Sequence, residues 1–313
     1  MQPFEPKIKT DEPSLPSPPQ TRRCTPPATA ALLSLHRHQR SLALLSLRRN
    51  ILHALLHLPV GIGGAASPPA ILILGFRGHG KSAFINTACR ALAGEEGPLI
   101  LRSETSPVGF PPAKAMRLAV SVAAAAGCSC GGWVEKVGEA EMVVEVIDAP
   151  PSAPPSAETA VVMIAAAETV SPECVVLVMR CSRQERERRL AVRRLTEMAG
   201  ELRNRGLPLL VVLTHKRSLG YCKQEELKLE VAFSARTDCV YFIENYTAES
   251  STKCGGLTVV KNDFDTHHTA LAIIRQCIEF VAQRRRQSSL KKIDLATKFD
   301  EKNEEDVIDS KRS

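Results

Sequence analysis

A glycine-rich run that contains one lysine and one serine stands at residues 75–82. It reads G-F-R-G-H-G-K-S, which is the spacing G-x-x-x-x-G-K-S. In this pattern the backbone N–H groups of the turn surround nucleotide phosphates, the lysine neutralises the β and γ oxygens, and the serine hydroxyl ligates Mg²⁺. Lys81 is therefore also the catalytic candidate. The predicted nucleotide-binding residues of the loop are Gly75, Arg77, Gly78, His79, Gly80, Lys81, Ser82 and Ala83.

Two elements must position this loop. The apolar run 70–74 (A-I-L-I-L) directly precedes it and predicts a buried strand, and the proline-free stretch 83–92 predicts a helix directly after it. The first turn of such a helix directs free N–H groups and the positive end of the helix dipole at the phosphates. Strand, loop and helix together predict a phosphate-binding site.

A phosphate loop needs a second metal anchor, which is an acid at the end of a neighbouring buried strand. Asp148 follows the apolar run 142–147, and its carboxylate can hold Mg²⁺ through water. The alternative is an ordinary aspartate that caps the next turn. Thr105, within S-E-T-S-P at 103–107, is a further candidate Mg²⁺ ligand, and the serines beside it are alternatives to it.

Catalysis needs a group that positions the attacking water and a cation that meets the developing charge. No Gln follows Asp148 closely. Within the loop, Arg77 is a candidate for the cation and His79 for the group that orients water. The alternative for both is an ordinary surface-facing side chain.

The rest of the chain predicts a sheet covered by helices. After an antiparallel hairpin, strands and helices alternate, which indicates a mostly parallel sheet with helices on both faces and ligand at the carboxyl ends of the strands. The predicted fold class is a three-layer α/β P-loop NTPase domain. The hairpin is formed by 116–126 and 141–147, the later strands are 174–179, 209–213 and 239–243, and the helices are 184–205, 225–233 and 266–285.

Composition divides the chain into four parts. Residues 1–27 are Pro-rich and predicted to be disordered, 28–64 form a basic amphipathic helical extension and linker, 65–285 form the domain, and 286–313 form a disordered charged tail. No Asp or Glu occurs between Glu12 and Glu95. We predict that the basic helix docks on the domain, and peripheral contact with an anionic membrane is the alternative. The apolar positions at helical spacing in the extension are Leu44, Leu47, Ile51, Leu55 and Leu58.

Several classes of function are disfavoured. The ten cysteines are scattered, so they read as reduced thiols rather than a disulfide framework or a zinc site. No apolar run of about 18 residues occurs, which argues against a transmembrane helix. We expect no nucleic-acid partner. The predicted location is the cytoplasm, and the acid-free N-terminal segment leaves a plastid or a mitochondrion as the alternative.

The loop extends, through Phe84 and Asn86, to G-x-x-G-x-G-K-S-x-F-x-N. In this form it resembles the loop of the translation-factor-related class of P-loop GTPases. It is most similar to the interferon-induced 44-like proteins and to the septin-related group, which includes immunity-associated and chloroplast-import GTPases. The resemblance covers about residues 65–285. It implies a Ras-like domain that binds GTP or GDP with Mg²⁺, and a protein partner or self-association through the nucleotide face.

The resemblance also assigns roles on the base side of the site. Asp148 falls where D-x-x-G is expected, and T-H-K-R at 214–217 falls where N/T-K-x-D is expected. His215 would then stack on the base and Asn245 would touch its edge; polar residues at strand ends without such a role are the alternative. The base-side candidates are Thr214, His215, Glu244 and Asn245.

Two departures from the family pattern limit what the resemblance implies. Arg217 stands where an aspartate normally reads guanine, and its side chain only donates hydrogen bonds. Pro151 stands where a glycine N–H normally meets the γ-phosphate, and proline has no N–H. The prediction is therefore nucleotide binding, with GTP favoured and ATP not excluded, and slow or partner-dependent hydrolysis. The alternatives are a pseudo-GTPase interaction module without turnover and an ATP-binding P-loop protein.

Overall fold

The chain divides into two compact units, Met1–Ser41 and Leu42–Ser313. Helix α1, Pro27–Leu56, begins in the first unit and ends in the second. No helix among the described residues is long and apolar enough to cross a bilayer. The computed structural model describes residues 27–60, 67–76, 78–94, 116–122, 140–146, 172–246, 252–254, 257–259 and 262–310.

A six-stranded sheet forms the centre of the larger unit, with the strand order β2-β3-β1-β4-β5-β6. Strand β2 is antiparallel to β3, and the other neighbouring pairs are parallel. The predicted mostly parallel sheet with one hairpin is therefore confirmed. The strands are β1 Ala70–Gly75, β2 Met116–Val122, β3 Ala140–Val146, β4 Cys174–Arg180, β5 Leu209–Thr214 and β6 Val240–Ile243.

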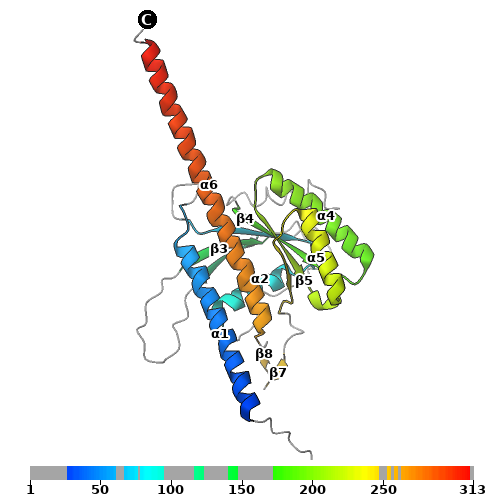
Figure 1. Cartoon of the computed structure of the whole chain (residues 1–313). Coiled ribbons are helices and arrows are strands. Elements are labelled where there is room, and N and C mark those ends of the chain that lie inside the picture. Colours follow the sequence, from blue (N-terminus) through cyan, green and yellow to red (C-terminus); the bar gives the residue numbers. More distant parts are fainter. Residues whose placement is uncertain are drawn as a thin grey trace, which may run out of the picture. The chain divides into compact units, whose positions relative to one another are not determined.

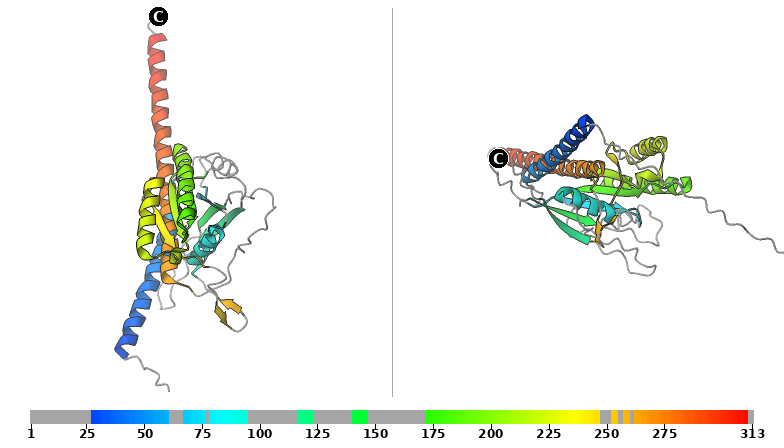
Figure 2. Two further views of the ribbon diagram at one scale, coloured as in Figure 1. Left: turned by 90° about the vertical axis from the view of Figure 1, so that its right-hand side faces the viewer. Right: turned by 90° about the horizontal axis from the view of Figure 1, so that it is seen from below.

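Helices cover both faces of this sheet (Figures 1 and 2). Along β1 the side chains alternate between two apolar clusters. Ile71 and Ile73 pack in the cluster that contains α2 (Lys81–Ala93), α6 (Phe264–Ser310) and the end of α1. Leu72 and Leu74 pack in the cluster with α4 (Glu185–Asn204) and α5 (Tyr221–Ala235). Helices therefore pack on both faces of a mostly parallel sheet, which is the predicted three-layer α/β arrangement.

The second half of α1 belongs to the core of the larger unit. Ile51, Leu52 and Leu55 are buried in the cluster with α2 and α6, and Leu44, Leu47 and Leu58 pack against that cluster. Arg48 Nε also donates a hydrogen bond to the Ala91 carbonyl near the end of α2, at 2.7 Å. The predicted docking of the extension is therefore confirmed for the part from Leu42 onward.

Some elements differ from the sequence-based expectation. Helix α6 continues to Ser310, through residues that were expected to form an irregular tail. The stretch 286–310 contains no proline or glycine and holds many good helix formers, so propensity favours helix there despite the charged composition. Helix α5 begins at Tyr221 rather than at residue 225. A small ribbon of β7 (Thr252–Cys254) and β8 (Leu257–Val259) was not predicted.

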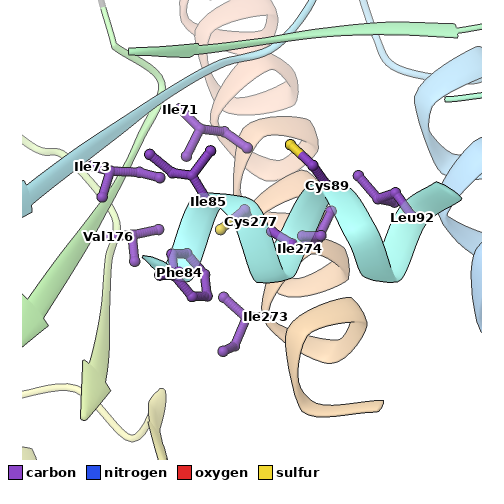
Figure 3. Close-up of a pocket in the computed structure, with 11 residues that line it drawn as sticks. Ile71, Ile73, Phe84, Ile85, Cys89, Leu92, Val176, Ile273, Ile274 and Cys277 are labelled. Atoms are coloured by element: carbon purple, nitrogen blue, oxygen red, sulfur yellow. The ribbon is translucent and has the colours of Figure 1, made fainter. Parts of the chain in front are cut away.

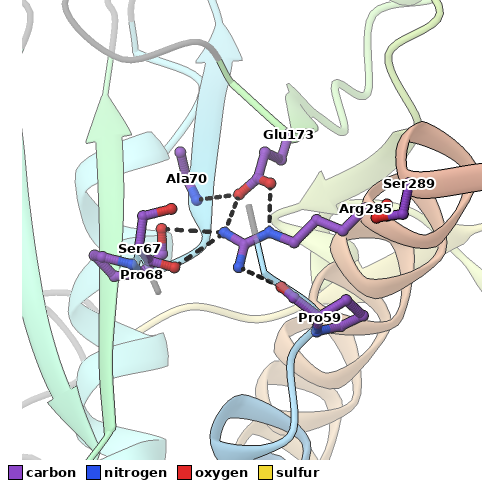
Figure 4. A network of polar contacts seen from close by, with 7 residues as sticks. All are labelled: Pro59, Ser67, Pro68, Ala70, Glu173, Arg285 and Ser289. Atoms are coloured by element: carbon purple, nitrogen blue, oxygen red, sulfur yellow. Dashed lines mark hydrogen bonds and ion pairs between the residues drawn. The ribbon is translucent and has the colours of Figure 1, made fainter. Parts of the chain in front are cut away.

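A buried ion pair joins segments at the amino-terminal edge of the sheet (Figure 4). Arg285 on α6 is 2% exposed, and its guanidinium donates two hydrogen bonds to the Glu173 carboxylate, at 2.6 and 2.7 Å. Glu173 precedes β4 and also accepts from the backbone N–H of Ala70, the first residue of β1. The guanidinium further donates to the carbonyl oxygens of Pro59, Ser67 and Pro68. One side chain therefore ties α6 to the segments on both sides of the linker.

Candidate nucleotide site

The glycine-rich loop connects the carboxyl end of β1 to the first turn of α2. A Cβ atom added at Gly75 would lie 2.4 Å from the carbonyl oxygen of Val178 on the neighbouring strand β4, so no larger residue fits there. Gly78 and Gly80 have φ values of +75° and +89°, a conformation that glycine adopts without steric cost. These three glycines are therefore required by the backbone path of the loop.

Lys81 reaches back into the loop that precedes it. Its side chain is buried, and Nζ donates hydrogen bonds to the carbonyl oxygens of Gly75 and Phe76, both at 2.8 Å. The ammonium group is thus held inside the curve of the loop, beside the N-terminal turn of α2. Ser82 and Ala83 follow in that turn and are partly exposed. This arrangement collects positive charge where an anion would meet the helix.

The ends of β5 and β6 support the loop from the side. Thr214 is fully buried, and its hydroxyl donates to the His79 carbonyl at 2.9 Å. Asn245 Nδ2 lies 3.5 Å from the Gly80 carbonyl oxygen, and Asn245 Oδ1 has no hydrogen-bond partner among the described residues. Thr214 and Asn245 therefore contact the glycine-rich loop itself. The sequence analysis assigned both residues to the base side. Their contacts with the loop join segments far apart in the chain, so the sequence does not reveal them.

His79 is turned towards the end of β4. Its Nδ1 accepts a hydrogen bond from the backbone N–H of Arg180 at 3.1 Å, and its ring packs edge-on against Phe76. Burial lowers the pKa of His79 to about 4, and the positive charges of Lys81 and Arg180 add to the effect. The ring is therefore neutral, and its single proton is on Nε2 because Nδ1 acts as acceptor. The nitrogen that would take a proton from water is already engaged.

The residues that the sequence analysis assigned to the base side include a group around a short turn after β5. His215 has φ +57° and lies 3.0 Å, through its Nδ1, from the Thr214 hydroxyl. The 3₁₀ turn Lys216–Ser218 follows. The backbone N–H of Arg217 donates to Glu244 Oε2 at 3.0 Å, so the carboxylate at the end of β6 lies directly beside Arg217. Sequence reasoning missed this pair, because the contact depends on the pairing of β5 with β6.

The loop after β6 is fixed to two helices. The backbone N–H of Tyr246 donates to Thr87 Oγ1 on α2, and the Tyr246 hydroxyl accepts from the backbone N–H of Asp263 at 2.7 Å. These contacts hold Glu244 and Asn245 at the edge of the site. Neither Thr87 nor Asp263 was a sequence candidate.

Some predicted site residues lie outside the described residues. These are Arg77, Thr105 and Asp148, together with Pro151. Within the described part of the chain, no group of three or more His, Cys, Asp or Glu side chains is placed to hold a metal ion. The residues that the structure does bring together are Gly75, Gly78, His79, Gly80, Lys81, Thr214 and Asn245 around the loop, and Glu244 beside Arg217.

A small cavity of about 30 Å³ lies behind the loop helix, between α2, α6 and the sheet (Figure 3). Its lining is apolar apart from two thiols, Cys89 and Cys277. A nucleotide needs polar partners and far more room, so this cavity is a packing gap and not part of the site.

The sequence matches no protein-family model and no curated protein. Among solved structures, it is similar to a mutation variant of SsGBP, with a TM-score of 0.36 and 16% identity over 70% of this chain and 57% of that chain. A second is a probable GTP-binding protein, engB, with a TM-score of 0.31 and 13% identity over 56% of this chain and 88% of that one. A third is the signal recognition particle receptor SRb-GTP/SRX complex from Chaetomium thermophilum, with a TM-score of 0.32 and 14% identity over 57% and 90%. The chain thus spans little more than half of SsGBP, and its fold assignment rests on the sheet order and register.

Proposed function

We propose that the chain binds a nucleotide, as its Mg²⁺ complex, in the loop Gly75–Ser82. The observation that supports this most is the buried ammonium of Lys81, held by the loop's own carbonyl oxygens in a turn of glycines before a helix N-terminus. When bound, Mg²⁺ would neutralise negative charge on the phosphates. The Ser82 hydroxyl and Asp148 are the proposed ligands, since both offer the oxygen atoms that Mg²⁺ prefers.

The first experiment identifies the nucleotide in protein purified without added nucleotide, and then titrates the stripped protein with fluorescent GDP and ADP in the presence of Mg²⁺. We expect binding in the micromolar range that Lys81→Ala weakens by about 100-fold or more, since the variant removes a charge-assisted contact to phosphate. Arg186→Ala, on the exposed surface of α4, is the matched control and leaves binding unchanged. Absence of binding at tens of micromolar would end the proposal.

We further propose that the base is guanine and that Glu244 supplies the acceptor that Arg217 lacks. The Glu244 carboxylate is fixed by the Arg217 N–H through Oε2, and no described residue engages its Oε1. Guanine presents donors at N1 and at the exocyclic amine, which a carboxylate accepts, whereas adenine presents an acceptor at N1 that a carboxylate repels. This arrangement favours guanine over adenine.

The substitution Glu244→Gln tests the assignment, because an amide offers both a donor and an acceptor. We expect affinity for GDP to fall about 10- to 100-fold, while affinity for xanthosine diphosphate rises, since xanthine carries an oxygen in place of the amine. Glu185→Gln, at an exposed acid on α4, is the control. Wild-type protein that prefers ADP would favour the ATP-binding alternative, and an unchanged base preference in the variant would remove Glu244 from the base site.

We propose that hydrolysis is slow or depends on a partner. His79 is neutral, and its Nδ1 is occupied by the Arg180 N–H, so it is not available as a base for water. The rate of hydrolysis is measured as single-turnover phosphate release by the parent protein and by the Lys81→Ala variant. Release at the rate of the variant would instead favour a pseudo-GTPase interaction module. We also propose a protein partner or self-association through the nucleotide face. Peripheral membrane contact through the basic helix and a cytoplasmic location are further proposals.

A further inference from the structure

Helix α5 carries an apolar strip on its outer face. Leu229 and Phe233, one helical turn apart, are 72% and 87% exposed. Residues four positions apart lie on the same side of a helix, and the buried side chains Leu227, Val231 and Ala235 occupy the other side. Core packing therefore does not account for the two exposed side chains. We call Leu229 and Phe233, with the neighbouring Glu225, Glu226 and Glu230, the outer strip of α5.

Acidic side chains border this strip on both sides. Glu226 and Glu230, again four residues apart, run along one side, and Glu225 lies on the other. All three are exposed, and none forms an ion pair with another described residue. The lysines of the helix, Lys223 and Lys228, lie in other rows. The outer strip of α5 is thus an apolar surface within an acidic border.

The first half of α1 carries basic side chains, whose charge is opposite to that of the outer strip of α5. Leu32 and Leu35, three residues apart, are 67% and 53% exposed. At 3.6 residues per turn they lie in different rows from Ile51 and Leu55, so they do not continue the face that docks in the core. The neighbouring polar side chains are basic, namely His36, Arg37, His38 and Arg40, and the sequence has no acid from residue 13 to residue 94.

We propose that the outer strip of α5 binds the first half of α1 from a second copy of this chain. The contact pairs Leu229 and Phe233 with Leu32 and Leu35, and sets the glutamate border against the basic side chains of α1. Each copy carries one surface of each kind, and the first half of α1 belongs to the unit Met1–Ser41, which is separate from the unit that contains α5. Two reciprocal contacts close a dimer, and a single contact propagates a chain of copies.

Sedimentation velocity of the full-length protein, from about 1 to about 50 μM, tests the proposal. We expect association that rises with concentration and weakens about fivefold or more when salt is raised from about 50 to about 300 mM, because the bordering charges are exposed. The double substitution Leu229→Ser with Phe233→Ser abolishes it without lowering the melting temperature, since both side chains are on the surface. Glu185→Arg, at an exposed acid on α4, is the matched control and leaves association unchanged.

A charge exchange identifies the partner surface. Glu226→Arg with Glu230→Arg weakens association about tenfold or more, and so does Arg37→Glu with Arg40→Glu, because each variant opposes like charges. An equal mixture of the two variants restores association, since every contact between unlike copies again pairs opposite charges.

Four results would overturn the proposal. The first is a parent protein that is monomeric at about 50 μM. The second is a Leu229→Ser, Phe233→Ser variant that associates like the parent, and the third is a mixture of the two charge-reversal variants that does not restore association. The fourth is binding of the monomer to vesicles of anionic phospholipid through Leu32 and Leu35. The last result would assign the first half of α1 to a membrane surface.

Discussion

The ion pair between Arg285 and Glu173 gives a stability prediction that follows directly from geometry. The substitution Arg285→Met keeps the length and apolar stem of the side chain but removes the guanidinium. It leaves the Glu173 carboxylate, which is 7% exposed, without its bidentate partner, and leaves the Pro59 and Ser67 carbonyl oxygens without their donor. Removing one member of a buried ion pair typically costs about 3–5 kcal/mol. We therefore expect the free energy of unfolding to fall by about 4 kcal/mol.

Urea denaturation followed by circular dichroism measures this change. For a folded unit of this size, 1 kcal/mol corresponds to roughly 2–4 °C, so the melting temperature should also fall by about 6–20 °C. Arg285→Lys keeps the charge but loses the planar fork, and we expect an intermediate loss of about 1–2 kcal/mol. The neighbouring exposed Arg286 provides the control, and Arg286→Met should change stability by less than about 0.5 kcal/mol.

A double variant separates the buried charge from the lost contacts. Glu173→Gln in the Arg285→Met background removes the unpaired carboxylate, so it should recover at least about 1 kcal/mol of the loss. The reasoning fails if Arg285→Met lies within about 1 kcal/mol of the parent, or if the second substitution gives no recovery.

Three further outcomes are expected. Burial, together with nearby arginines, lowers the pKa of His267 to about 4, whereas the unfolded value is about 6.5. The folded state therefore favours the neutral imidazole. The stability that this provides is fully present above pH 6.5 and falls by roughly 3 kcal/mol as the pH drops to about 4. His267→Phe should therefore flatten the pH dependence of the free energy of unfolding, measured by urea denaturation, over that window. Thr214→Val should weaken nucleotide binding about 5- to 30-fold in fluorescence titrations by removing the hydrogen bond to His79, and Thr214→Ser should not. Gly75→Ala should cost about 3 kcal/mol or more because of the 2.4 Å contact, whereas Gly200→Ala, with nothing within 4 Å on a helix, should raise stability by about 0.5–1 kcal/mol in the same assay.

The sheet was predictable because its strands are short apolar runs between strong breakers. Helix α4 was placed within one residue at each end, since Gly206, with φ +65°, follows it closely and permits the turn out of the helix. The end of α6 was not predicted correctly. Its charged composition indicated disorder, while the absence of proline and glycine favoured continued helix. Two local rules conflicted there.

The candidate site was predictable only where the backbone dictates the residue. The glycines of the loop are visible in the sequence because their conformations exclude other residues. The contacts of Thr214 with His79 and of Glu244 with Arg217 were not predictable, since they depend on the register of β5 against β6 and on side-chain directions that periodicity does not specify.

The docking of α1 determines how this protein can be divided. A fragment that starts at residue 65 has the complete glycine-rich loop but lacks Ile51, Leu52 and Leu55, so it would present to water the apolar surfaces of α2 and α6 that they cover. It would also lose Arg48, which donates to the end of α2. A fragment from residue 42 keeps the whole compact unit. A fragment that keeps this apolar core covered therefore begins inside a helix, well before the first strand.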